Sequence, residues 1–97
     1  LVLGGDHSLS FPVMEALAAR FGPDGYATIH FDTHADTGAD VAGVVNSHGT
    51  PFHRGVVAGV LRGQHVFQIG LRGAWPGPAE FAWMREQGYR WRTMDEC

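Results

Sequence analysis

The chain has 97 residues, one cysteine, no lysine and a formal net charge of −3 at pH 7. Without a basic patch, nucleic acid and anionic membrane surfaces are poor partners, and no apolar run reaches the ~20 residues that a membrane span requires. The single Cys97 permits no internal disulfide, which favours the cytoplasm as the compartment.

Segments typical of strands and helices alternate along the sequence. An apolar strand end at residues 1–3 leads through a glycine turn into a helix that Ser10 is expected to cap and that Gly22-Pro23 ends. The later expected elements are a strand at 26–32 with apolar groups on both faces, a helix from 50, a strand at 65–71, a helix at 78–87 and a strand at 89–94. This alternation predicts an α/β fold, with a parallel sheet and helices on both faces. Because both ends of the chain look cut through strands, we expect residues 1–97 to form a partial domain whose N-terminal and C-terminal portions lie outside them.

The first chemical pattern is Asp-Thr-His-Ala-Asp at residues 32–36, at the end of the strand expected at 26–32. In an extended chain alternate side chains share a face, so Asp32, His34 and Asp36 are expected to point the same way. Crowded carboxylates repel one another unless a cation offsets their charge. Carboxylate mixed with imidazole, without thiolate, favours manganese over a structural zinc. The alternative is a solvated loop whose acidic residues cap a turn.

A fourth candidate ligand, His7, stands in Gly-Gly-Asp-His-Ser at residues 4–8. It follows the first expected strand as Asp36 follows the second, and ligands of parallel α/β sheets gather at the carboxyl ends of strands. We therefore expect His7 to converge with the 32–36 segment on one cation. Asp6 either orients His7 or merely forms the turn.

Two more histidines have chemical alternatives. His48 lies in Ser-His-Gly-Thr-Pro-Phe at residues 47–52, just before an expected helix, where it could donate or relay a proton or could be a plain surface histidine. His30 shares a strand face with Asp32, and we favour an interior hydrogen-bonding role for it over metal ligation. Trp75, in a loop of glycine and proline, could wall an active site or a subunit contact.

Taken in order, these segments closely resemble the ureohydrolase family, which includes arginases and agmatinases. Three blocks match: Gly-Gly-Asp-His-Ser at 4–8, Phe-Asp-Thr-His-Ala-Asp at 31–36 and Ser-His-Gly-Thr-Pro-Phe at 47–52. Gln-Ile-Gly-Leu-Arg-Gly at 68–73 is similar to the family's next strand and loop. The resemblance spans nearly the whole chain. It implies an arginase-like three-layer αβα fold that holds two manganese ions bridged by a hydroxide.

By the same resemblance, His7, Asp32 and Asp36 serve one manganese, and Asp32 bridges to the second, which His34 also ligates. His48 matches the family's histidine for proton transfer or substrate contact. The implied reaction is hydrolysis of a guanidino compound to urea and an amine by a homo-oligomer, a trimer or hexamer. The family's later Asp-x-Asp ligand pair and its guanidinium-binding acid do not occur in these residues, so we expect the isolated chain to be inactive.

The substrate that the resemblance implies first is agmatine, which would yield putrescine and urea. Arginases carry an asparagine two residues after the last Asp of the 31–36 block, and Gly38 stands there in this chain. The 47–52 block is also more similar to agmatinases than to arginases. Guanidinobutyrate, guanidinopropionate and arginine are alternatives within the family, and a formimino substrate is a weaker one. A non-catalytic metal-binding or interaction module is the alternative of another class.

Overall fold

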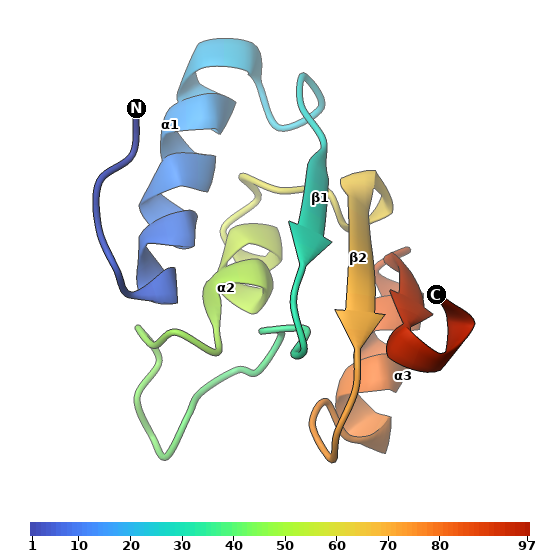
Figure 1. Cartoon of the computed structure of the whole chain (residues 1–97). Helices are drawn as coiled ribbons and strands as arrows, with labels where there is room; N and C mark the ends of the chain where they lie inside the picture. The colour runs from blue at the N-terminus through green and yellow to red at the C-terminus, as the bar shows by residue number, and fades with distance from the viewer.

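The computed structural model describes residues 1–97 as a three-stranded sheet with helices packed beside it (Figure 1). The strands, all parallel and in the order β1-β2-β3, are β1 (Thr28–Phe31), β2 (Val66–Leu71) and β3 (Arg90–Thr93). The helices are α1 (Ser10–Phe21), α2 (Pro51–Val57) and α3 (Pro78–Glu86). Short 3-10 turns cover His7–Leu9, Gly63–His65 and Met94–Glu96. The predicted α/β class with a parallel sheet is confirmed.

The observed elements differ from the predicted ones mainly at their ends. Residues 1–3 join no strand; they are exposed and run beside α1 (Figure 1). A strand needs a neighbour to pair its backbone groups, and these residues have none. Ser10 is the first residue of α1 rather than its cap, because a 3-10 turn leads directly into the helix. Asp6 caps that turn by accepting the Ser8 N–H at 2.8 Å, so it acts as a turn former.

Helices α2 and α3 lie on the same face of the sheet. The His30 ring of β1 packs on Phe52 of α2, with ring centroids 4.5 Å apart. The Phe81 ring of α3 packs on Trp91 of β3, with centroids 5.3 Å apart. Trp91 is in register with Gln68 of β2, whose side chain contacts His30, so α2 and α3 cover one side.

The opposite face of the sheet is open over β1. Ile29 and Phe31 are 65% and 73% exposed, although the sequence predicts a strand buried on both faces. The physical reason is that α2 and α3 pack on the other face, and no element of residues 1–97 covers this face of β1. Residues 1–97 therefore contribute one helical layer of the predicted αβα arrangement. None of their helices combines the length and the apolar character that crossing a bilayer demands.

The core lies between the helices and the sheet, and its most buried apolar side chains are Phe52, Leu61, Val66, Leu71 and Met84. Helices α1 and α2 approach closely at Gly55, where a Cβ would stand 2.7 Å from the Met14 sulfur. The Tyr89 hydroxyl donates to the Phe52 carbonyl at 3.1 Å and ties the start of β3 to α2. This packing holds α2 against the edge of the sheet where β1 and β2 end.

Candidate metal centre

The 32–36 loop bends sharply once β1 ends at Phe31. Thr33 and His34 form the bend, and Asp36 has a φ of 54°, in the left-handed region that aspartate tolerates better than most residues. The period-two alternation expected of an extended chain is therefore wrong for this segment. The bend buries Asp36 to 4% exposure and leaves His34 exposed.

Backbone hydrogen bonds hold this loop from two sides. The Arg72 N–H, just beyond β2, donates to the Thr33 carbonyl at 2.9 Å. The Phe52 N–H, in the first turn of α2, donates to the Asp36 carbonyl at 3.2 Å. The position of the Asp36 carboxylate thus depends on both neighbouring elements.

Four side chains converge at this edge of the sheet. His7, His30, Asp32 and Asp36 each offer one ligand atom, and these atoms lie within 4.8 Å of one another. The His7 Nδ1–H donates to Asp36 Oδ2 at 2.6 Å, across 29 positions of sequence. The His30 Nε2 lies 3.4 Å from Asp32 Oδ2 and 3.9 Å from Asp36 Oδ2. The structure thus brings three of the predicted ligands together and adds His30 to them.

The members of this cluster shift one another's ionisation. The hydrogen bond to Asp36 raises the pKa of His7. Burial lowers the pKa of His30, against the attraction of both carboxylates. Burial also acts to raise the pKa of Asp32, but the His34 N–H and the nearby imidazoles outweigh it, and the net pKa is lowered. Asp32 is therefore held as a carboxylate beside a neutral His30.

This donor set fits a divalent cation. Carboxylate oxygens and imidazole nitrogens without a thiolate suit manganese better than a structural zinc. Asp36 is buried, and an ionised carboxylate in that position needs a counter-charge. The Nε2 of His30 is also buried and has no hydrogen-bond partner, although it faces the acids. A cation among these oxygens would supply the counter-charge.

His34 lies outside the four converging residues. Its exposed ring packs on Trp75, with centroids 5.5 Å apart. Its backbone N–H, rather than its ring, contacts the acids and donates to Asp32 Oδ1 at 2.9 Å. Ligation of a second ion by His34 stays a prediction.

His48 and His34 line a cavity of ≈ 350 Å³ together with Asp36, Asp40 and Trp75. His48 is exposed, and its Nδ1 lies 3.3 Å from the Ser47 hydroxyl. The buried Asp36 and the two histidines all line the cavity, so a small molecule in it would meet all three. A proton-transfer role for His48 stays a prediction.

Gln68 is a functional candidate that the sequence reasoning missed. Its side chain is fully buried, and its Nε2 donates to the Ala35 carbonyl at 2.7 Å and lies 3.1 Å from His30 Nδ1. Buried polar side chains need such partners. The available signal was a glutamine inside the otherwise apolar segment 66–71, because glutamine is seldom placed in a buried strand without a polar contact.

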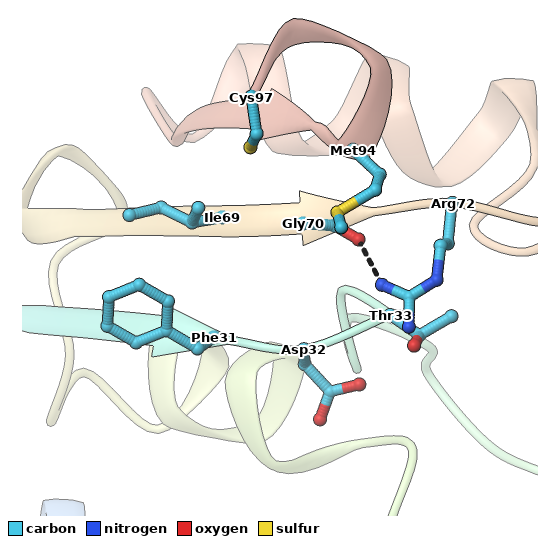
Figure 2. Close-up of a pocket in the computed structure, with 8 residues that line it drawn as sticks. All are labelled: Phe31, Asp32, Thr33, Ile69, Gly70, Arg72, Met94 and Cys97. Carbon is cyan, nitrogen blue, oxygen red and sulfur yellow. Dashed lines mark hydrogen bonds between the residues drawn. The ribbon is translucent and has the colours of Figure 1, made fainter.

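A second cavity, of ≈ 580 Å³, lies on the other side of the carboxyl ends of β1 and β2 (Figure 2). Met94 and Cys97 line it next to β2, and the Asp32 carboxylate points away from both (Figure 2). The Arg72 guanidinium donates to the Gly70 carbonyl at 2.9 Å instead of meeting a carboxylate. This cavity therefore shares Asp32 with the cluster, whereas His7, His30 and Asp36 do not line it.

Comparison with known proteins agrees with this architecture. A family model described as Arginase family matches residues 1–97. The chain is 42% identical over 99 residues to a mitochondrial agmatinase of Gallus gallus, covering 100% of this chain and 28% of that protein. It is 38% identical over 97 residues to a guanidinobutyrase of Pseudomonas aeruginosa, covering 100% of this chain and 30% of that protein. The solved formimidoylglutamase of Bacillus subtilis matches with a TM-score of 0.86 at 34% identity, over 99% of this chain and 29% of that one. The chain thus spans less than a third of the length of these relatives.

Proposed function

Because this chain belongs to the arginase family, whose model matches residues 1–97, we propose that it is the part of a guanidino hydrolase that carries the first metal ligands. The complete enzyme would hydrolyse agmatine to putrescine and urea. The observation that carries this proposal is the convergence of His7, Asp32 and Asp36 in one group of ligand atoms.

Two manganese ions are the cofactor we propose. His7, Asp32 and Asp36 would hold the first ion, and Asp32 and His34 would contact the second, together with an Asp-x-Asp pair from outside residues 1–97. When bound, the two ions supply the positive charge that makes water nucleophilic near neutral pH. To take part, the His34 ring would have to turn away from Trp75, on which it now packs.

His48 is the proton carrier in this proposal. Water adds to the guanidinium carbon, the C–N bond to the substrate chain breaks, and the departing amine takes up a proton. His48 lines the cavity beside Asp36 and is open to solvent, so it can pass a proton to that amine directly or through water.

The lining of the same cavity favours a substrate whose chain ends in a cation. Asp40 is an acidic residue of the lining that is not a proposed metal ligand, and no arginine or lysine lines the cavity. The ammonium group of agmatine would be attracted to Asp40, whereas the carboxylate of guanidinobutyrate would be repelled. This charge balance supports agmatine over the guanidino acids.

Trp75 supports agmatine over arginine. A Cβ placed on Gly38 would stand 3.2 Å from Cζ2 of Trp75 and 3.1 Å from the Asp40 carbonyl oxygen. The asparagine of the arginase pattern would therefore require Trp75 and the Asp40 carbonyl to shift by a few tenths of an ångström. Without that asparagine, the site lacks the group expected to hold an amino-acid end.

The rest of the enzyme is also part of the proposal. We take residues 1–97 as a partial domain, because the chain spans less than a third of its relatives, and we expect the complete enzyme to be a homo-oligomer, a trimer or hexamer. The lone Cys97 supports the cytoplasm as its compartment. Cell fractionation tests this point, since the agmatinase relative is named mitochondrial.

Urea release by the complete enzyme tests the function. With manganese, we expect kcat/KM for agmatine to exceed that for guanidinobutyrate or arginine by at least about tenfold, because only agmatine brings a cationic chain end without a carboxylate to Asp40. The isolated 97-residue chain with manganese should release no urea. A preference for guanidinobutyrate would overturn the substrate assignment. If the complete enzyme released urea from no guanidino compound, its assignment as a guanidino hydrolase would be overturned.

A further inference from the structure

We propose that His30 is a positioning residue for the metal ligand Asp32, and that Gln68 sets the tautomer in which His30 does this. In this arrangement the His30 Nε2–H donates to the Asp32 carboxylate and does not bind the ion. The inference rests on the proposed function, since it takes Asp32 as a manganese ligand.

The orientation of the Gln68 amide comes from the Ala35 carbonyl. The Gln68 side chain is fully buried, and its Nε2 lies 2.7 Å from that carbonyl oxygen. Turning the amide by half a rotation would put two acceptor oxygens at this distance, with no water to separate them. The amide nitrogen therefore faces Ala35, and with it His30.

The amide in turn selects the tautomer of His30. The same Gln68 nitrogen lies 3.1 Å from His30 Nδ1, so a donor faces that ring nitrogen. Nδ1 must then be the acceptor, and in the neutral ring the proton sits on Nε2.

The proton on Nε2 has Asp32 as its nearest acceptor. The side chain of His30 is 9% exposed, its Nε2 has no hydrogen-bond partner, and Asp32 Oδ2 is 3.4 Å away. The other oxygen, Oδ1, already accepts the His34 N–H at 2.9 Å. A small rotation of the carboxylate would engage both oxygens with fixed donors and orient the remaining lone pairs toward a cation.

Direct ligation by His30 would require the opposite tautomer. A lone pair on Nε2 would place the ring proton on Nδ1, facing the Gln68 amide hydrogens at 3.1 Å. Two donors would then oppose each other in a buried site, which costs the desolvation of both groups. The contacts of the ring therefore assign it to the carboxylate and not to the ion.

Two amide variants of the complete enzyme separate these roles. His30→Gln places an NH₂ group near the former Nε2, whereas His30→Asn reaches only the former Nδ1. His65→Asn, which changes the histidine directly before the first residue of β2, is the matched control. Three quantities are measured: the manganese dissociation constant by competition with a chelating indicator, the directly bound ¹⁴N by pulsed EPR, and the melting temperature of the metal-free protein.

We expect His30→Asn to weaken manganese binding about 10–100-fold, and His30→Gln by less than about tenfold, with the ¹⁴N coupling of the wild type kept in both. Loss of one bound ¹⁴N in either variant would make His30 a ligand and overturn the inference. Unchanged affinity in His30→Asn with a lowered melting temperature would make its role structural and overturn it as well. Failure of the wild type to bind manganese would instead overturn the proposed function, and the inference with it.

Discussion

Asp36 combines three unusual properties in a single residue. It is 4% exposed, its φ is 54°, and it accepts the His7 Nδ1–H at 2.6 Å. A left-handed aspartate costs free energy, and such conformations persist where the surrounding structure imposes them. The carbonyl of the same residue is held by the Phe52 N–H, so the backbone is fixed independently of the carboxylate. The side chain is thus presented to the cluster by a rigid loop.

Replacing Asp36 tests the metal centre directly. Asp36→Asn keeps the shape and the left-handed backbone but removes the negative charge, so manganese affinity of the complete enzyme should fall by more than about 100-fold. Titration with manganese measures the change. Asp40→Asn, which alters an exposed carboxylate of the neighbouring cavity, is the control and should leave the affinity within about tenfold. Equal affinities in the Asp36 variant and the wild type would contradict the assignment.

His53 gives the fold a pH dependence that is separate from the metal cluster. Burial lowers the pKa of His53, against a smaller effect of the Thr37 backbone, and its ring stacks on Trp83 at 4.6 Å. The unfolded chain therefore binds a proton at His53 more readily than the folded chain does. Folding stability is then lost as pH falls below about 6.5. In His53→Phe, which keeps the stacked ring, the melting temperature should fall less between about pH 7.5 and 5 than in the wild type. If the melting temperatures of the two proteins fell equally with pH, His53 would not be the source of this pH dependence.

At the scale of secondary-structure elements, the 3-10 turn before β2 packs tightly on the end of α3. A Cβ on Gly63 would stand 2.2 Å from the Gln87 carbonyl oxygen and 2.9 Å from its Cβ. That backbone cannot yield easily, because the Gln87 N–H donates to the Trp83 carbonyl at 2.9 Å. The absence of a side chain at residue 63 is thus what lets α3 sit against the start of β2.

Gly63→Ala should therefore lower the free energy of unfolding by about 1–3 kcal/mol, the range typical of overpacking in a close contact. Chemical denaturation of wild type and variant measures the difference. Gly5→Ala offers a matched control, since a Cβ there meets nothing within 4 Å. If both variants lose the same stability, the contact with α3 is not the cause.

At the scale of the whole molecule, one side of the sheet lacks a covering layer. β1 pairs with β2 alone, and Ile29 and Phe31 on its open face are 65% and 73% exposed. A free strand edge beside exposed apolar side chains favours association with other chains. In the complete enzyme, further chain would cover this face.

The isolated 97-residue chain should accordingly self-associate as its concentration rises. Ile29→Thr combined with Phe31→Thr places a β-branched side chain at both positions of β1 but removes the apolar surface, so the double variant should stay monomeric to higher concentration. Sedimentation velocity across a concentration series compares the two. A wild-type chain that is monomeric throughout would show that the open face does not drive association.

The positions of the helices and strands could be predicted well from the sequence, but which of their faces are buried could not. Alternating apolar segments, glycine stops and helix-start prolines predicted all the helices and the three strands of the sheet, within a few residues at their ends. The strand expected at residues 1–3 was wrong, because a strand depends on a neighbour that local sequence does not reveal. Burial of both faces of β1 was wrong for the same reason.

What the sequence alone determined was the kind of chemistry, carboxylates and imidazoles at the carboxyl end of a parallel strand. It also predicted that His7 would meet the 32–36 segment, although the strand at residues 1–3 on which that prediction relied is absent. What only the tertiary structure decided was the orientation of each group. The left-handed φ of Asp36, the Gln68 contact to His30 across 38 positions, and the packing of Trp75 over Gly38 all depend on chain segments that meet only after folding. Local periodicity describes a residue's neighbours along the chain, whereas the direction of a side chain in a loop is set by its neighbours in space.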